Sequence, residues 1–243
     1  MGRFGAFSGA IARRMMRRPL FFGQVIEQTW HTTTRCLLPV VAVTFPFGMV
    51  MALQGLEIFR IFGAERMLAS LISIATLREL SPVLASVLVA AQGGSSCAAS
   101  LGAMRIKEEL DATEVMAIDS IKFHVVPRVI AMTVACPLLN VAGSVAGVAG
   151  GYFTAVFIKG ESGGIFMAEL WSFMEPVDLY GGFVKTTLFG LMIGLISCYH
   201  GYRARGGAAG VGKAVNDTVV HSVVAFITLN YFLTSFLFGA VAP

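Results

Sequence analysis

Long stretches almost free of charged residues dominate this chain and predict membrane-spanning helices. A crossing needs about 20 mostly apolar residues. Windows of at least that length cover residues 36–56, 67–104, 129–158, 181–202 and 218–241. We therefore expect an all-α, polytopic membrane protein with about five transmembrane helices.

The second window is too long for a simple crossing. A straight helix over residues 67–104 would reach ~57 Å at ~1.5 Å per residue, against a hydrocarbon core of ~30 Å. We expect it either to project from the membrane or to break. Pro82 and Gly93-Gly94 are the candidate break points.

Composition agrees with this pattern. The chain has 243 residues, of which 56% are hydrophobic and 13% charged, whereas a soluble domain carries about 25% charged residues. That excludes a water-soluble globule, and the net charge of +4 bears on topology rather than on nucleic acid. The four cysteines lie far apart without a C-x-x-C pair, so we expect buried thiols and no metal site.

Residues 1–35 differ from the rest, because six arginines face a single acid, Glu27. Phe4, Phe7, Ile11 and Met15 recur at helical spacing, which is typical of an amphipathic helix in the membrane interface. A disordered basic tail and a transit peptide are the alternatives. Residues 20–30 predict a second, elbow-like helix. We thus divide the chain into interfacial and elbow helices, 1–35, and a five-span domain, 36–243.

The distribution of Lys and Arg predicts the orientation. Thirteen lie in the connections on one side of the predicted spans, and four on the other. The positive-inside rule places the N-terminus and residues 105–128 in the cytoplasm, with the C-terminus outside.

A short charged segment, residues 105–119, follows the second window. Read as one helix, it forms pairs such as Arg105–Glu109 and Lys107–Asp111, each worth ~0.2–0.5 kcal/mol. Spacing alone favours a solvated connecting helix. The charged residues of interest are Arg105, Lys107, Glu108, Glu109, Asp111 and Glu114.

Three stretches together resemble the MlaE/YrbE family, the permeases of Mce-associated ABC lipid transporters. They read LRELSP from Leu77, LGAMRIKEELDATEVMAID from Leu101, and VPR from Val126. The resemblance extends over about residues 38–239. Ser81, Gln92 and Ser120 depart from it, standing where Gly, Arg and Pro are common.

The resemblance implies a permease subunit in a bacterial inner membrane, paired with a second copy that is identical or related. A separate cytoplasmic ATPase binds ATP, a periplasmic Mce protein receives or supplies lipid, and the permease needs no cofactor of its own. Residues 105–119 become the coupling helix for the ATPase. Arg78, Glu79 and Pro82 then lie near the lipid cavity. The alternative is that Arg78 and Glu79 lie at the outer, non-cytoplasmic interface of the same membrane.

Two further motifs need interpretation. Gly143, Gly147 and Gly151 form a GxxxGxxxG face, which permits close helix packing; we expect this within one subunit, with a dimer seam as the alternative. Residues 207–214 nearly spell a nucleotide-binding P-loop, but Ala214 replaces the Ser or Thr that holds magnesium. We interpret them as a flexible basic loop before the last span, which Asn216 or Asp217 could cap.

Other functions fit less well. A secondary transporter often shows inverted repeats, which five spans do not provide. A scaffold without transport would not need charges in the second window, and no nucleophile–base pair indicates an enzyme. We expect His221 to be a hydrogen-bonded packing residue rather than a proton carrier.

Overall fold

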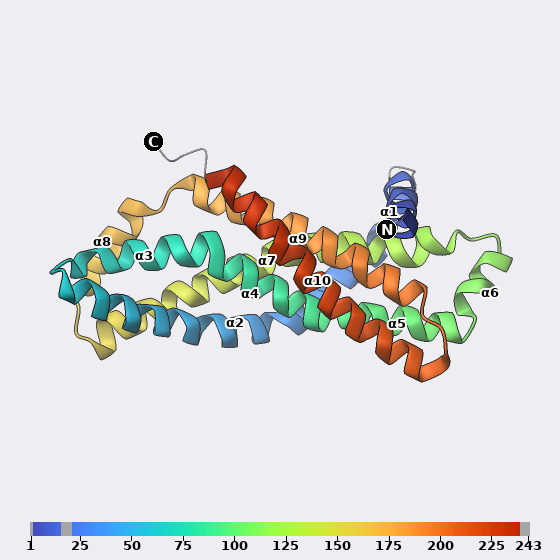
Figure 1. Cartoon of the computed structure of the whole chain (residues 1–243), viewed down its shortest axis with the longest axis horizontal. Coiled ribbons are helices and arrows are strands. Elements are labelled where there is room, and N and C mark those ends of the chain that lie inside the picture. Colours follow the sequence, from blue (N-terminus) through green and yellow to red (C-terminus); the bar gives the residue numbers. More distant parts are fainter. Residues whose placement is uncertain (1, 16–20, 239–243) are drawn as a thin grey trace. The chain divides into compact units, whose positions relative to one another are not determined.

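The computed structural model describes residues 2–15 and 21–238, and within these ranges the chain is α-helical without a β-strand (Figure 1). Five helical runs are long and apolar enough to cross a membrane, as the sequence predicts. They are Phe22–Ile61, Glu65–Ile106, Ile121–Ile158, Pro176–Tyr202 and Gly207–Phe238. The protein is therefore a multi-pass, all-α membrane protein.

The helical elements follow one another in a simple order. Short turns of π-helix (η2 to η5) and one 3₁₀ turn (η1) continue the α-helices. The elements are α1 (Gly2–Met15), α2 (Phe22–Ile61), η1 (Glu65–Met67), α3 (Leu68–Ala75), η2 (Thr76–Leu80), α4 (Ser81–Leu88), η3 (Val89–Gly94), α5 (Ser95–Ile106), α6 (Glu109–Val115), η4 (Ile121–Val125), α7 (Val126–Tyr152), η5 (Phe153–Ile158), α8 (Gly163–Phe173), α9 (Pro176–Tyr202) and α10 (Gly207–Phe238).

The second run does not break at either predicted point. Instead π-helical turns occur just before Pro82, at Thr76–Leu80, and around Gly93-Gly94, at Val89–Gly94. A π turn absorbs an extra residue while the chain stays helical, and such turns often occur at functional sites. The run therefore stays helical throughout, and the local disturbance falls near the positions that the sequence singled out.

The ends of two helices differ from the sequence interpretation. α2 continues without interruption from the range expected for the elbow helix into the first span. α10 begins at Gly207, so the predicted flexible loop at residues 207–214 is wrong, and Asn216 and Asp217 lie inside the helix rather than at its cap. The predictions for residues 16–20 and 239–241 lie outside the described residues.

The chain forms two compact units. One comprises Met1–Cys36, Val87–Cys136 and Thr187–Leu229, and the other Leu37–Ser86, Pro137–Thr186 and Asn230–Pro243. In the first unit α1 packs its apolar face inward. Ile11 is buried, and the rings of Phe4 and Phe7 lie 5.2 and 5.6 Å from the ring of Tyr199 on α9.

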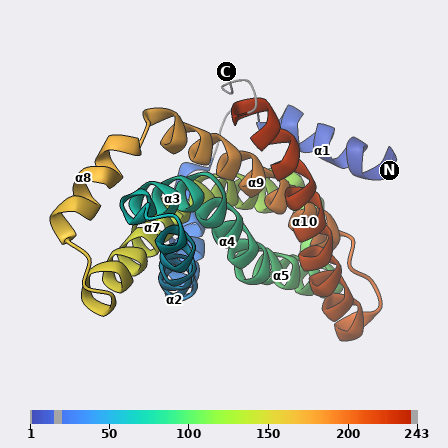
Figure 2. The ribbon, with the colours of Figure 1, turned by 60° about the vertical axis from the view of Figure 1, so that its left-hand side comes forward.

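The second unit has a core formed by side chains of α2, α3, η5 and α8. Figure 2 labels α2, α3 and α8 on the ribbon. α3 contributes three buried residues, and the neighbouring elements contribute the others. The cluster consists of Ala52, Leu56, Leu68, Ala69, Ile72, Ala155, Phe166 and Leu170. Burial of this apolar surface holds the ends of the helices together.

Glycines let α7 approach its neighbours within the second unit. A Cβ at Gly143, Gly147 or Gly151 would lie within 2.8–2.9 Å of a side chain of Ser81, Thr76 or Ile72, respectively. A Cβ at Gly48 of α2 would collide with the backbone carbonyl of Gly147. The GxxxGxxxG face is thus occupied by contacts within the subunit. The cysteines are all buried, as predicted.

Candidate functional site

A cluster of paired charges lies among the membrane-spanning helices of the second unit. The π turn η2 carries Arg78 and Glu79, and α9 carries Asp178 and Lys185. Arg78 Nε donates to Asp178 Oδ1 at 2.5 Å, and Lys185 Nζ donates to Glu79 Oε1 at 2.8 Å. Two cations and two anions therefore balance, which is the condition under which charges are tolerated at membrane depth.

α10 completes this cluster with three residues spaced one helical turn apart. Asn230 Nδ2 donates to Glu79 Oε2 at 2.8 Å. Thr234 Oγ1 accepts from Lys185 Nζ at 2.7 Å and donates to Glu79 Oε1 at 2.8 Å. The guanidinium carbon of Arg78 lies 4.6 Å from the centre of the Phe238 ring, a cation–π distance. Both Glu79 oxygens are thus occupied.

Lys185, like Asp178, is fully buried in this network. Its side chain is 0% exposed, against 39% for Glu79, and it also donates to the backbone carbonyl of Arg78 at 2.9 Å. Pro82, four residues after Arg78, has no N–H to offer that carbonyl. Pro82 is buried, and its role is structural: it leaves the backbone carbonyl of Arg78 free to accept the hydrogen bond from Lys185.

An apolar groove of about 650 Å³ meets the cluster at Asp178, whereas Arg78, Glu79 and Pro82, the residues predicted for the lipid cavity, are not among those that line it. Asp178, which is fully buried, lies at the wall of the groove, and its Oδ2 has no hydrogen-bond partner in the structure. Aromatic and aliphatic side chains form most of the remaining wall. The lining comprises Phe45, Leu77, Asn140, Val141, Ser144, Val145, Val148, Ala149, Tyr152, Phe153, Phe157, Met167, Leu170, Trp171, Met174, Asp178, Leu179 and Phe183. Such a groove with polar groups at one place suits an amphipathic ligand.

The predicted coupling segment lies in the first unit and is not one helix. α5 ends at Ile106, Glu108 takes a left-handed backbone conformation (φ 59°), and α6 runs from Glu109 to Val115. Because of this break, Arg105 and Lys107 form ion pairs with other residues than helical spacing predicts. Arg105 pairs with Asp111 at 2.5 Å and Lys107 approaches Glu109 at 4.0 Å, so the expected Arg105–Glu109 and Lys107–Asp111 pairs were wrong.

α6 nevertheless presents an exposed surface. Leu110 is fully buried and anchors the helix, while Val115 and Met116 are 88% and 62% exposed. Glu109 is exposed too, and Glu114 accepts a hydrogen bond from the Tyr202 hydroxyl at 3.2 Å. Acidic and apolar side chains therefore share one small projecting element.

Asp119, at the end of this segment, ties α1 to the connection. Its carboxylate accepts from Arg14 Nε at 2.6 Å and from the N–H groups of Ile121 and Lys122. Burial favours the neutral acid, but the hydrogen bonds from Arg14 and from the backbone outweigh it and lower the pKa of Asp119.

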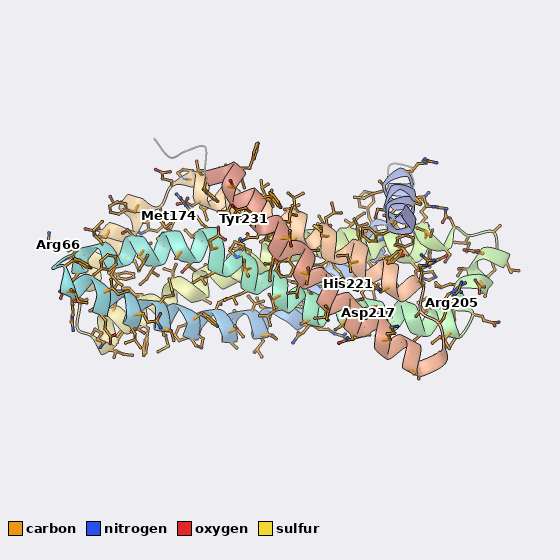
Figure 3. All side chains as sticks on the ribbon, viewed as in Figure 1. Arg66, Met174, Arg205, Asp217, His221 and Tyr231 are labelled. Carbon is orange, nitrogen blue, oxygen red and sulfur yellow. The ribbon has the colours of Figure 1, made fainter. Side chains whose placement is uncertain are left out.

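His221 belongs to neither site. Its Nδ1 lies 2.6 Å from the carbonyl oxygen of Asp217, one turn earlier on α10 (Figure 3), and its ring stacks on His200 at 5.0 Å. The hydrogen bond and the ring stacking agree with the expectation from the sequence, but the side chain is exposed rather than packed in a core.

Sequence reasoning missed the polar partners of Arg78 and Glu79. Lys185 does give a signal, because a lone cation inside an apolar window needs a partner. Asp178 lies just before the predicted window 181–202, where an acidic residue is not unusual. Asn230 and Thr234 gave no signal, since neutral polar residues are common in membrane helices.

Comparison with known proteins identifies the chain's relatives. The family model "Permease MlaE" matches residues 25–236. A "Probable ABC transporter permease protein" of Rickettsia bellii is 38% identical over 98% of this chain and 92% of its own length. The "Intermembrane phospholipid transport system permease protein MlaE" of Haemophilus influenzae is 31% identical over 99% of this chain and 92% of its own. "Protein TRIGALACTOSYLDIACYLGLYCEROL 1, chloroplastic" of Arabidopsis thaliana is 31% identical over 95% of this chain and 66% of its own. The chain therefore belongs to the MlaE permease family.

Proposed function

We propose that this protein is the membrane permease of an ABC-type transporter that moves phospholipids or related lipids across or out of a bacterial inner membrane. The observation that carries the proposal is the groove of about 650 Å³ beside a charge-balanced cluster. Its apolar wall suits acyl chains, and Arg78, whose side chain is 28% exposed, suits the head-group region. The name of the Haemophilus relative supports a phospholipid as the substrate.

A separate ATPase supplies the energy in this proposal. The P-loop-like residues 207–214 are the first turns of α10, whereas a working P-loop connects a strand to a helix. Lys213 is exposed on α10, and Lys213→Ala should leave transport nearly unchanged. The projecting α6, with Glu108 and Glu109 at its start, is the proposed docking element for the ATPase.

The remaining partners follow from the family. We expect a second permease copy, identical or related, and a periplasmic Mce protein on the side opposite α6. This arrangement places the N-terminus in the cytoplasm. The positive-inside distribution of Lys and Arg supports that orientation.

Purification of the tagged chain from its native membrane, followed by reconstitution into liposomes, tests the function. The lipid probe is a fluorescently labelled phosphatidylethanolamine. We expect an ATPase subunit to co-purify and the labelled lipid to move only when ATP is added. Movement driven by an ion gradient without ATP would indicate a secondary transporter. A complex that hydrolyses ATP without moving lipid would contradict the proposal.

The groove itself is tested by filling it. Val145 lines the groove and is 67% exposed, so Val145→Trp should reduce lipid movement without disturbing the core. Val220→Trp, on an exposed position of α10 outside the groove, is the matched control. If both variants moved the labelled lipid equally well, the groove would not be part of the lipid pathway.

A further inference from the structure

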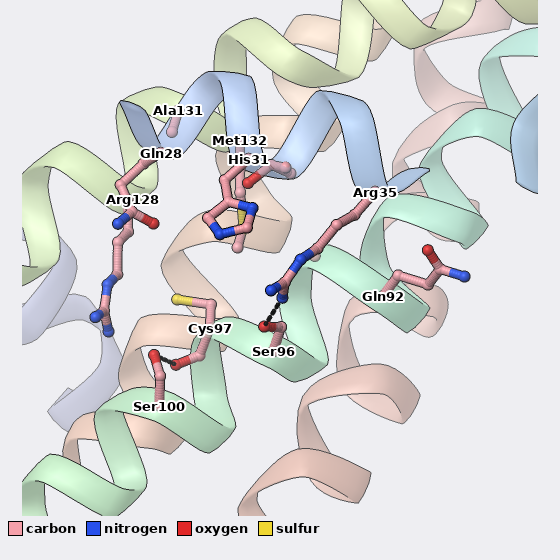
Figure 4. A pocket seen from close by; sticks show the side chains of 12 residues that line it. Gln28, His31, Arg35, Gln92, Ser96, Cys97, Ser100, Arg128, Ala131 and Met132 are labelled. Atoms are coloured by element: carbon pink, nitrogen blue, oxygen red, sulfur yellow. Dashed lines mark hydrogen bonds between the residues drawn. The ribbon is translucent and has the colours of Figure 1, made fainter. Parts of the chain in front are cut away.

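A second cavity, of about 220 Å³, lies wholly within the first unit (Figure 4). It is formed by the beginning of α2, by η3 and α5, and by the beginning of α7. Its lining is polar, unlike that of the groove in the other unit. The lining residues are Gln28, His31, Thr32, Arg35, Gln92, Gly93, Ser96, Cys97, Ser100, Arg128, Ala131 and Met132.

The charges around this cavity are unbalanced. Two arginines line it, and none of its twelve lining residues is an Asp or Glu. In the view of Figure 4, Arg128 and Arg35 flank His31, with Cys97 and Ser96 below. The Arg78–Asp178 and Lys185–Glu79 pairs show how the same chain compensates its other cations in the apolar helices.

The two guanidinium groups have weak partners. Arg35 donates to Ser96 Oγ at 3.3 Å. Arg128 donates from Nη2 to Met104 Sδ at 3.7 Å and also interacts with the Cys97 thiol, and its buried Nη1 has no hydrogen-bond partner in the structure. A buried donor without an acceptor carries a desolvation cost that an anionic ligand would remove.

The backbone is built to bring these groups together. Gln92 and Gly93 belong to the π turn η3, and a Cβ at Gly93 would lie 3.0 Å from Thr32 Cγ2. Arg35 and Arg128 directly precede the predicted first and third spans, 36–56 and 129–158. By the positive-inside prediction, both lie at the cytoplasmic head-group level, where anionic lipids are concentrated.

We propose that this cavity is an anion site that binds a phosphate group through Arg35 and Arg128, with His31, Gln28 and the serine hydroxyls completing the shell. A cavity of this size fits a phosphate or a lipid head group, whereas sites for whole drug-sized ligands are about 300–1,000 Å³. The phosphate comes either from an anionic phospholipid of the inner leaflet or from free inorganic phosphate. The proposal does not rest on the transport function, because the groove and the charged cluster belong to the other unit.

Native mass spectrometry of the protein from nanodiscs containing phosphatidylglycerol and phosphatidylcholine tests the lipid source. We expect the wild type to retain phosphatidylglycerol preferentially. Each of Arg35→Gln and Arg128→Gln should lower that retention roughly tenfold, the loss expected from one charge-assisted hydrogen bond. Arg205→Gln is the control, because Arg205 is an exposed arginine of the same unit outside the cavity (Figure 3).

Gln28→Glu guards against a folding artefact, because it keeps the size of the side chain and places a carboxylate in the cavity. It should abolish anion retention while the protein stays monodisperse. Isothermal titration calorimetry of the detergent-solubilised protein with inorganic phosphate tests whether the cavity binds the free anion. Binding of phosphate without preference for phosphatidylglycerol assigns the site to the free anion. The proposal would be overturned if the Arg35→Gln/Arg128→Gln double variant and Gln28→Glu retained phosphatidylglycerol and bound inorganic phosphate as the wild type does.

Discussion

The ammonium group of Lys185 lies 2.8 Å from Glu79 Oε1, although 106 residues separate the two in the chain. The pair joins α9 to η2, and through Thr234 it also joins α10. This ion pair therefore ties together three membrane helices of the second unit.

Removing one partner of this pair should destabilise the protein asymmetrically. Glu79→Ala leaves a fully buried ammonium without its anion, which costs about 3–5 kcal/mol. Lys185→Met leaves a carboxylate that is 39% exposed and keeps Asn230 and Thr234, so it should cost less. Thermal unfolding in detergent, monitored by size-exclusion chromatography, gives the order. A double variant, Glu79→Gln/Lys185→Met, should recover part of the loss; a double variant less stable than Glu79→Ala would contradict the pairing.

Close helix packing predicts a sharp difference between glycines. Gly48→Ala should lower the melting temperature, because its Cβ would collide with the Gly147 carbonyl of α7, and overpacking typically costs about 1–3 kcal/mol. Gly212→Ala is the control, since nothing lies within 4 Å of its Cβ in α10 and Ala favours a helix. If both variants melted like the wild type, the contact between α2 and α7 would be wrong.

The contact between Arg14 and Asp119 predicts a pH-dependent position of α1. Because the pKa of Asp119 is lowered in the folded state, its contribution is present above the ordinary carboxyl pKa of about 3.9 and is lost as pH falls through the lower, folded value. Spin labels at the exposed positions Gly9 of α1 and Arg203, directly after α9, report the distance between α1 and the end of α9.

We expect a narrow distance distribution from pH 7 down to about 4 and a broader one below that. In Asp119→Asn the distribution should be broad at pH 7 as well, because the neutral amide offers Arg14 no charge. A distribution in Asp119→Asn that matched the wild type at pH 7 would show that α1 is held by its apolar face alone.

Charge reversal on α6 tests the docking element. Glu108→Lys and Glu109→Lys should weaken or uncouple the ATPase, because truncating one partner of a buried interfacial charge pair costs about 2–5 kcal/mol and a rim charge costs little. Lys122→Glu, outside the acidic part of the segment, is the matched control. Pull-down of the ATPase and lipid transfer are measured for all three. Full binding and transfer in both glutamate variants would return α6 to the role of a solvated connection.

The spans were predictable because their signal is local. Uncharged windows and small-residue spacing indicate membrane helices and their close contacts, and Gly143, Gly147 and Gly151 do pack within the subunit. The start of α10 was not predictable in this way. Glycines at 207, 210 and 212 suggest a loop, but the helix begins at Gly207, and Ala214 is its first buried residue.

The charged sites depend on information that is not local. The pairing of Lys185 with Glu79 requires knowing that α9 lies beside η2, which neither window reveals alone. The exchange of partners around Arg105 arises from the left-handed backbone of Glu108, a conformation rare for a residue other than glycine. Helical spacing therefore assigned the right residues to the wrong pairs.

Photocrosslinking in the groove tests the central claim, that this chain holds a lipid beside the Arg78–Asp178 pair. A benzoylphenylalanine replaces Leu179, a groove residue that is 45% exposed, or Val224 of α10, which is 61% exposed and outside the groove. The protein is irradiated in native membranes that contain radiolabelled phospholipid. We predict stronger lipid labelling at position 179 than at position 224, and loss of this excess when Val145→Trp fills the groove. Equal labelling at the two positions, unchanged by Val145→Trp, would contradict the account.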